Sequence, residues 1–215
     1  MAVVGIVPAG GFGERLGADR PKAFVVLAGR PLLDWSLDVL SQVCDRVVVA
    51  VPQAYAEEPD RVAGGDSRSA SVRNALQAAP EAELAVVHDA ARPLLTRELV
   101  ESRLEALEPG VDGAVAAAPM SDTVKQAAAD GRVMRTLDRS SLWSVQTPQV
   151  FRARILREAL TRDESALAAA TDDASLVEEI GGTVRVVEAP RENLKITRET
   201  DLRLAESLLR QRVGC

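Results

Sequence analysis

The chain has 215 residues, 47% of them hydrophobic, and a formal net charge of −6. This length suits one α/β domain with a buried core, so we expect a single domain over residues 1–215, and the composition excludes an intrinsically disordered protein. The negative charge disfavours non-specific nucleic-acid binding, which needs a basic surface. Two cysteines are too few for a disulfide framework, and no apolar run reaches the roughly 20 residues of a membrane helix, so we expect a cytoplasmic protein that binds neither nucleic acid nor a membrane.

Short runs of β-branched residues alternate with amphipathic stretches along the chain. The runs predict strands over residues 3–7, 46–51, 84–88, 114–118 and 183–187. Apolar residues at helical spacing predict helices over residues 31–43, 69–79, 96–107 and 199–211. This alternation predicts an α/β fold with a mostly parallel, Rossmann-like sheet, helices on both of its faces, and ligands bound beyond the carboxyl ends of the strands.

The segment from Asp122 to Trp143 breaks the alternation. It has strand-like pieces on either side of Asp130-Gly131, a favourable hairpin turn, but it lacks the apolar content of a core layer. We therefore expect residues 122–143 to form a projecting β-hairpin arm, with a long surface loop as the alternative. A projecting hairpin leaves strand edges and apolar residues uncovered, so we predict that the arm joins two copies of the chain in a homodimer.

A glycine-rich turn, "AGGFGERLGADRPK" at residues 9–22, follows the first predicted strand. Such a turn lets backbone N–H groups approach phosphates closely, but this one lacks the Gly-Lys-Ser/Thr ending of a P-loop. A dinucleotide-binding fingerprint is disfavoured because Leu16 replaces its third glycine and no acidic residue ends the second strand. The cations of the turn, Arg15, Arg20 and Lys22, favour a triphosphate, although solvated surface cations on an ordinary connection are the alternative for this motif alone.

Six further motifs follow the turn: "GGDSRSASVRNAL", "VVHDAARPLL", "DTVK", "RTLDRSSLWSVQTPQVF", "TDDASLVE" and "ENLKIT". In this order and spacing the chain resembles, nearly from end to end, the 2-C-methyl-D-erythritol 4-phosphate cytidylyltransferase family. The resemblance implies a nucleotidyltransferase that transfers CMP from CTP to 2-C-methyl-D-erythritol 4-phosphate in isoprenoid biosynthesis and releases pyrophosphate. It also implies Mg²⁺ as the cofactor, because a triphosphate normally reacts as its metal complex, with the metal held by phosphate and water oxygens and by no assigned protein ligand.

The resemblance assigns residues to CTP. The catalytic cations that it implies are Arg15, Lys22 and Lys195, and the CTP-binding residues are Ala9, Gly10, Gly11, Gly65, Asp66, Ser71 and Ala90. Fixed cations suit this chemistry, because an anionic phosphate attacks another phosphate and the repulsion between them must be offset. Without the family, Ser71 is interpreted as a residue of a helix's first turn, and Lys195 as an outward-facing charge on a short strand.

The resemblance also assigns residues to the acceptor. The implied contacts are Asp89, Arg92, Thr136, Arg162 and Thr171. Thr136 lies on the arm, so its contact is expected across the dimer interface, and Arg162 is equally consistent with a solvated helix arginine. We interpret His88, the only histidine, as a satisfied strand-end residue and not as a general base, because the attacking phosphate is already ionised at neutral pH.

Three other functions compete with this interpretation. A ribitol 5-phosphate cytidylyltransferase shares the CTP-binding apparatus and differs mainly in the acceptor pocket. An NAD-linked oxidoreductase is disfavoured by Leu16 and the missing acidic residue. A catalytically silent binding protein is expected to have lost a cation, yet all three are present. Two residues depart from the common family pattern: Gly10, which is harmless for a backbone contact, and Glu14, which weakens the positive potential beside Arg15.

Overall fold

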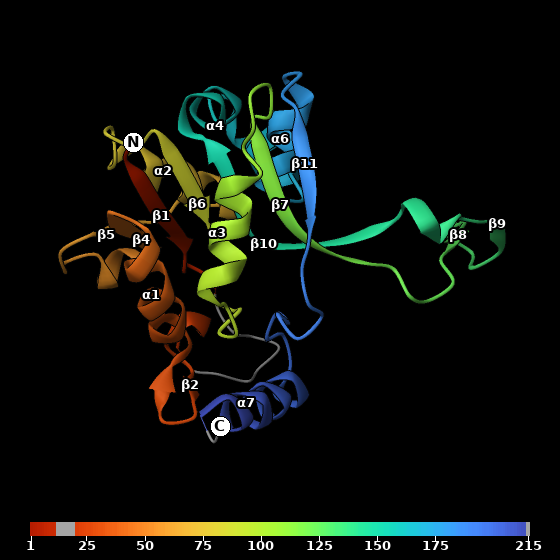
Figure 1. Cartoon of the computed structure of the whole chain (residues 1–215), viewed down its shortest axis with the longest axis horizontal. Coiled ribbons are helices and arrows are strands. Elements are labelled where there is room, and N and C mark those ends of the chain that lie inside the picture. Colours follow the sequence, from red (N-terminus) through yellow and green to blue (C-terminus); the bar gives the residue numbers. More distant parts are fainter. Residues whose placement is uncertain (12–19, 214–215) are drawn as a thin grey trace.

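The structure is a computed structural model that describes residues 1–11 and 20–213 (Figure 1). Its main feature is a seven-stranded sheet in the order β11-β7-β10-β6-β1-β4-β5. The strands are β1 (Val3–Pro8), β4 (Arg46–Val51), β5 (Arg61–Ala63), β6 (Leu84–Val87), β7 (Gly113–Pro119), β10 (Trp143–Arg152) and β11 (Val184–Glu188). Only β10 runs antiparallel to its neighbours in this sheet, β6 and β7. The predicted α/β fold with a mostly parallel sheet is confirmed.

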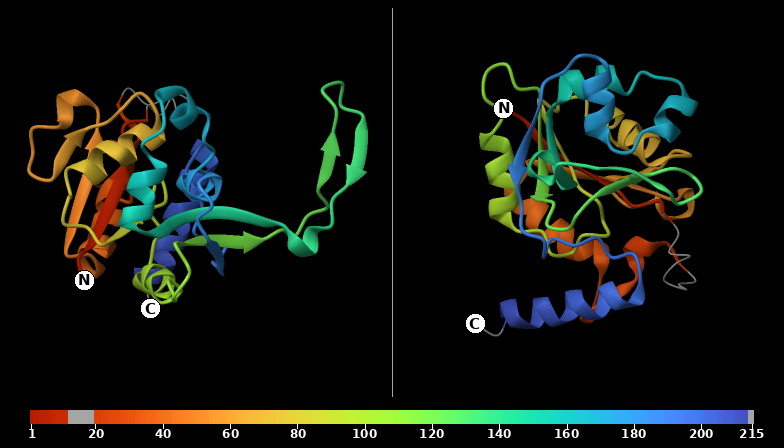
Figure 2. Two further views of the ribbon diagram at one scale, coloured as in Figure 1. Left: turned by 90° about the horizontal axis from the view of Figure 1, so that it is seen from above. Right: turned by 90° about the vertical axis from the view of Figure 1, so that its right-hand side faces the viewer.

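Helices cover both faces of the sheet (Figures 1 and 2). One layer contains α2 (Arg68–Gln77), α4 (Ala153–Ala159), α5 (Glu164–Ala169) and α6 (Asp173–Glu179), and the other contains α1 (Leu32–Val43) and α3 (Arg97–Glu105). Successive side chains of a strand point to opposite faces, so Ile6 and Val48 pack in the first core while Val7 and Val49 pack in the second. Burial on both faces explains why these strands are continuous apolar runs.

The last helix, α7 (Glu199–Val213), lies below the sheet beside the short strands β2 (Val26–Leu27) and β3 (Arg30–Pro31) (Figure 1). Leu27, Ile196 and Ala205 meet there in a third apolar cluster. The backbone N–H of Ile196 donates to the carbonyl oxygen of Ala91 at 2.8 Å. This packing brings the segment before α7 back to the loop that follows β6.

The prediction of a short strand around Lys195 is wrong, because residues 194–197 have no regular secondary structure. The backbone of this segment bonds to a loop through Ile196 and not to a strand, so no ladder of hydrogen bonds forms.

The projecting arm is present between β7 and β10 (Figure 2). It consists of the hairpin strands β8 (Lys125–Ala127) and β9 (Val133–Thr136), followed by a 3₁₀ turn at Arg139–Ser141. Gly131 lies in the hairpin turn with a φ of 85°, a conformation that favours glycine. Val133 and Met134 are 56% and 65% exposed, so within one chain the arm leaves apolar side chains in water. Further 3₁₀ turns lie at Lys22–Phe24 and Gln53–Tyr55.

None of the helices in the described part of the chain is long and apolar enough to cross a membrane.

Candidate active site

The loops that follow β1, β5 and β6 meet at the carboxyl edge of the sheet and line a cavity of about 340 Å³. Open α/β sheets bind their ligands at this edge, and the volume suits a small molecule. The predicted site residues that line it are Ala9, Gly10, Gly11, Lys22, Gly65, Asp66, Ser71, Asp89, Ala90 and Lys195. The fold therefore gathers in one cavity residues that lie at both ends of the sequence.

The first wall of the cavity is the end of β1 and the described part of the glycine-rich turn. The N–H of Ala9 donates to the carbonyl of Ala50 at 2.7 Å, and the N–H of Lys22 donates to the carbonyl of Gly11 at 3.0 Å. A Cβ built on Gly10 or Gly11 meets no described atom within 4 Å. These glycines are therefore not required by packing against described residues, which agrees with a role in letting a ligand approach the backbone.

The second wall is the loop between β5 and α2. Ser71 Oγ accepts from the N–H of Gly65 at 3.1 Å and donates to the carbonyl of Ser67 at 2.9 Å. A Cβ on Gly65 would lie 2.5 Å from the Cβ of Ala70, so glycine is required for this close approach. Ser67 caps α2 by accepting from the N–H of Ala70 at 3.1 Å. Ser71 thus lies in the first turn of α2, as expected without the family, and also lines the cavity.

Three charged side chains that line the cavity, Arg68, Asp89 and Lys195, are linked by hydrogen bonds, and Arg68 is linked further to Asp173 outside it. Arg68 Nε donates to Asp89 Oδ1 at 2.8 Å, and Lys195 Nζ donates to Asp89 Oδ2 at 2.7 Å. On its other side Arg68 Nη1 donates to Asp173 Oδ2 at 2.6 Å. Burial raises the pKa of Asp89, but the positive charges of Arg68 and Lys195 outweigh it and hold that pKa well below its usual range. Asp89 is therefore ionised at neutral pH.

A second cavity of about 440 Å³ adjoins the first and shares Arg68, Asp89 and Lys195 with it. Its lining adds two predicted acceptor residues, Arg92 and Thr171. Arg92 Nη1 donates to the carbonyl of Asn193 at 2.7 Å, whereas its buried Nε has no hydrogen-bond partner among the described residues. The site therefore has two compartments. They share a common wall formed by the cations Arg68 and Lys195 and the carboxylate of Asp89.

Two predicted residues, Thr136 and Arg162, line neither cavity. Arg15 lies outside the described residues. Thr136 lies on the arm, where its Oγ1 accepts from Lys125 Nζ at 2.6 Å. Arg162 forms an ion pair with Glu179 at 3.0 Å on the surface after α4. The roles assigned to these three residues stay predictions.

Comparison with known proteins decides which family has this site. The family model described as 2-C-methyl-D-erythritol 4-phosphate cytidylyltransferase matches residues 3–211. The proteins of that name from Rubrobacter xylanophilus and Nocardia farcinica are 42% and 44% identical, over 97% and 99% of this chain and 95% and 96% of theirs. The crystal structure of the 2-C-methyl-D-erythritol 4-phosphate cytidylyltransferase from Thermus thermophilus is 38% identical, covers 98% of this chain and 100% of that chain, and has a TM-score of 0.82.

The chain belongs to the 2-C-methyl-D-erythritol 4-phosphate cytidylyltransferase family. It is therefore an enzyme, a nucleotidyltransferase that uses CTP and acts in isoprenoid biosynthesis. The ribitol 5-phosphate alternative is disfavoured, because the family model and the curated relatives carry the methylerythritol name.

His88 of this cytidylyltransferase is fully buried at the end of β6. Its Nε2 lies 3.1 Å from the carbonyl oxygen of Arg92, which accepts only, so this nitrogen carries the proton. Its Nδ1, 3.2 Å from Thr147 Oγ1, accepts from that hydroxyl, which in turn accepts from the N–H of Asp89 at 3.0 Å. Burial lowers the pKa of His88 to about 4. His88 is thus neutral and satisfied, as predicted from the sequence, and it orients the backbone of Asp89.

We expect the free energy of unfolding to decrease as pH falls from about 6.5 to about 4, because unfolded His88 binds a proton in this range and folded His88 does not. The decrease from this residue is on the order of 3 kcal/mol. Chemical denaturation of the wild type and of His88→Asn at several pH values measures it, since the variant lacks this titration. Equal pH slopes for the two proteins would contradict the assignment.

Arg68 was not singled out from the sequence, although "GGDSRS" contains it. The signal that was available is its position: Arg68 follows the N-cap Ser67 directly, at the start of α2. The positive end of the helix dipole disfavours a cation in the first turn, so an arginine there requires a compensating partner. In this cytidylyltransferase the partners are Asp89 and Asp173.

Proposed function

We propose that the common wall of the two cavities is where this cytidylyltransferase joins CMP to 2-C-methyl-D-erythritol 4-phosphate. The observation that carries the proposal is that Lys195 and Asp89 line both cavities. A group on this wall can contact a ligand in either compartment. The transfer itself requires such a meeting point, because the α-phosphorus of CTP and the acceptor phosphate must come within bonding distance.

CTP occupies the first cavity in this proposal. The backbone of Ala9, Gly10 and Gly11 contacts the phosphates, and Lys22 lies beside them. The cytosine base contacts the Gly65–Asp66 loop, where backbone groups can accept from its 4-amino group and donate to its ring oxygen. Uracil reverses the hydrogen-bonding character at the 4-position, so the same rigid loop discriminates against it.

The acceptor occupies the second cavity. Asp89, which is ionised, accepts a hydrogen bond from a polyol hydroxyl, while Arg92 supplies positive charge and Thr171 a hydroxyl group. An oxygen of the acceptor's phosphate attacks the α-phosphorus of CTP, the bond from that phosphorus to the bridging oxygen of pyrophosphate breaks, and pyrophosphate leaves. Lys22, Arg15 and Lys195 offset the negative charge that gathers on the reacting phosphates.

Mg²⁺ is proposed as the cofactor of this reaction. The described residues contain no cluster of three or more His, Cys, Asp or Glu side chains suited to a metal ion. Asp89 is engaged by two cations, and the exposed Asp66 is the other carboxylate among the described residues that line the first cavity. This donor set fits an ion held mainly by triphosphate and water oxygens. When bound, the ion neutralises part of the triphosphate charge.

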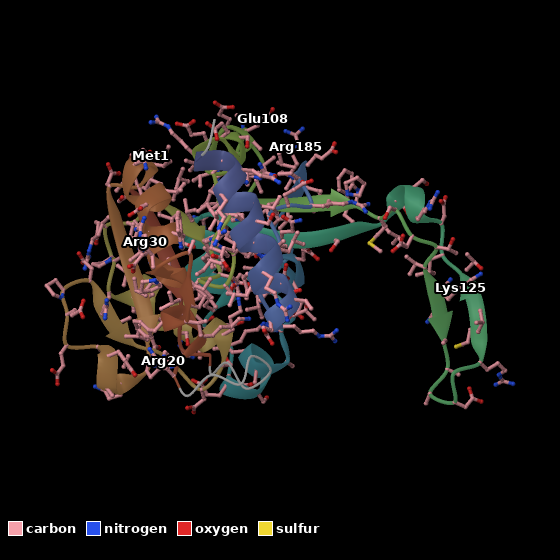
Figure 3. All side chains as sticks on the ribbon, turned by 90° about the horizontal axis from the view of Figure 1, so that it is seen from below. Met1, Arg20, Arg30, Glu108, Lys125 and Arg185 are labelled. Atoms are coloured by element: carbon pink, nitrogen blue, oxygen red, sulfur yellow. The ribbon has the colours of Figure 1, made fainter. Side chains whose placement is uncertain are left out.

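A homodimer formed through the arm is proposed to complete the site. Figure 3 shows Lys125 far out on the arm, and Thr136 is bonded to it, so within one chain this threonine lies far from the cavities. In the proposed dimer, a second chain covers the exposed Val133 and Met134 of the arm, and Thr136 of that arm contacts the acceptor in the active site of the second chain. Arg162 is assigned to the same shared interface.

We expect pyrophosphate release to require CTP together with 2-C-methyl-D-erythritol 4-phosphate, with kcat/KM for CTP at least about a hundredfold above that for UTP, because the wrong base leaves buried polar groups unpaired. A coupled pyrophosphate assay with each nucleotide measures this ratio. Competition between methylerythritol and ribitol phosphates for limiting CTP serves as the acceptor control. Comparable values for the two nucleotides would remove the base-reading role of the Gly65–Asp66 loop, and CDP-ribitol as the main product would contradict the acceptor.

A further inference from the structure

Arg68 lies between two buried carboxylates, those of Asp89 and Asp173. Its Nε donates to Asp89 at 2.8 Å, and its Nη1 donates to Asp173 at 2.6 Å. Asp173 is completely buried on α6, and Asp89 is only 6% exposed. The guanidinium fork is planar, so bonding both carboxylates fixes its orientation. Arg68 is therefore held in place by a residue 105 positions away that lies outside the first cavity.

Lys195 is bonded to the same carboxylate through a more exposed side chain that makes no second ion pair in the described structure. Its ammonium group donates to Asp89 at 2.7 Å, and its side chain is 43% exposed compared with 28% for Arg68. A buried carboxylate that loses all its cations is strongly destabilised. With Arg68 in place, Asp89 keeps a cation when Lys195 turns away. Without Arg68, Lys195 would be the remaining basic side chain bonded to Asp89 in the described structure.

We propose that Arg68, anchored by Asp173, is a positioning residue that holds Asp89 and thereby releases Lys195 for the reacting phosphates. The inference rests on the role proposed above for Lys195. It adds two residues, Arg68 and Asp173, that act on the transfer through Asp89 and Lys195. The expected kinetic signature is a fall in kcat with a smaller change in KM for CTP, because the glycine-rich turn still binds the phosphates when Lys195 stays on Asp89.

The test is a set of steady-state measurements on Arg68→Gln, Arg68→Lys and Asp173→Asn. We expect kcat to fall about tenfold or more in Arg68→Gln and about threefold to tenfold in Asp173→Asn. Arg68→Lys should recover part of the loss, since it keeps a cation beside Asp89 but cannot bond both carboxylates. The double variant Arg68→Gln/Asp173→Asn should be no slower than Arg68→Gln alone, because Asp173 acts through Arg68.

The matched control is Arg73→Gln. Arg73 lies on the same helix and forms an ion pair with Glu164 at 2.6 Å, away from both cavities. Its kcat should equal that of the wild type. Thermal unfolding and circular dichroism of every variant show that the measured proteins are folded. If Arg68→Gln does not fold, the kcat of Asp173→Asn tests the inference in its place.

Three results would overturn the inference. They are wild-type kcat in Arg68→Gln, wild-type kcat in Asp173→Asn, and a loss in Arg68→Gln that Arg68→Lys does not reduce. Lys195→Met, measured in parallel, separates this inference from the proposed function. Wild-type kcat in Lys195→Met overturns both, whereas a loss in Lys195→Met without a loss in Arg68→Gln overturns only the role of Arg68.

Discussion

Replacing Lys195 by methionine is expected to lower kcat about a hundredfold, the effect of removing roughly 3 kcal/mol of transition-state stabilisation. Lys195 lies on the wall between the two cavities, and its ammonium group is bonded to Asp89 at 2.7 Å. Methionine has nearly the same length and shape but no charge, so packing is preserved while the cation is lost. The nearly half-exposed side chain contributes little to the core, so we expect only a small change in thermal stability.

Arg203→Met is the matched control for this variant. Arg203 is a 71% exposed cation on α7 that is paired with Glu199, and it lines neither cavity. Steady-state assays at saturating CTP and acceptor compare the two proteins with the wild type. The control should keep full activity. A Lys195→Met enzyme with near-wild-type kcat would show that this lysine does not stabilise the negative charge of the transition state.

Placing glutamate at both Val133 and Met134 is expected to convert the proposed homodimer into a monomer and to reduce kcat/KM at least about tenfold. These apolar side chains are 56% and 65% exposed in one chain, and burying two new carboxylates in an interface is strongly unfavourable. Loss of the partner also removes Thr136 from the site that it is proposed to complete. Sedimentation velocity gives the oligomeric state, and the pyrophosphate assay gives kcat/KM.

The double variant Gln126→Glu/Arg132→Gln controls for charge. It lowers the net charge of the arm by the same two units but keeps Val133 and Met134. We expect it to remain dimeric and active. If the Val133/Met134 double variant sediments as a dimer, or as a monomer with full activity, the arm does not complete the active site.

The local patterns of the sequence determined most of the fold. The β-branched run from Arg46 to Val51 forms β4 with the expected bounds, because burial on both faces of a parallel sheet requires such a run. Asp130-Gly131 similarly indicated the turn of the arm, since Gly131 supplies a positive φ. Patterns of this kind depend on residues a few positions apart, so the sequence alone is sufficient to predict them.

Only the tertiary structure revealed β10 as an antiparallel strand inside the parallel sheet. Its buried half includes Gln146, Thr147 and Gln149, whose polar side chains hide the strand from any hydrophobic pattern. Their burial is possible because residues far away in the sequence form hydrogen bonds with them. Asn193 donates to Gln146 Oε1 at 2.8 Å, and Gln149 donates to Asp172 at 2.7 Å. Such partners cannot be inferred from neighbouring residues.

The same distinction holds for the site. The glycine-rich turn was recognisable from its local backbone requirement, and the Gly65 loop from the resemblance of its continuous motif to the family. The chain from Asp173 through Arg68 and Asp89 to Lys195 was not, because its links join residues 105, 21 and 106 positions apart. Each charge taken alone looks like a surface residue. Only the tertiary structure brings the buried carboxylates of Asp89 and Asp173 within hydrogen-bonding distance of Arg68 and Lys195, and the two cations compensate for that burial.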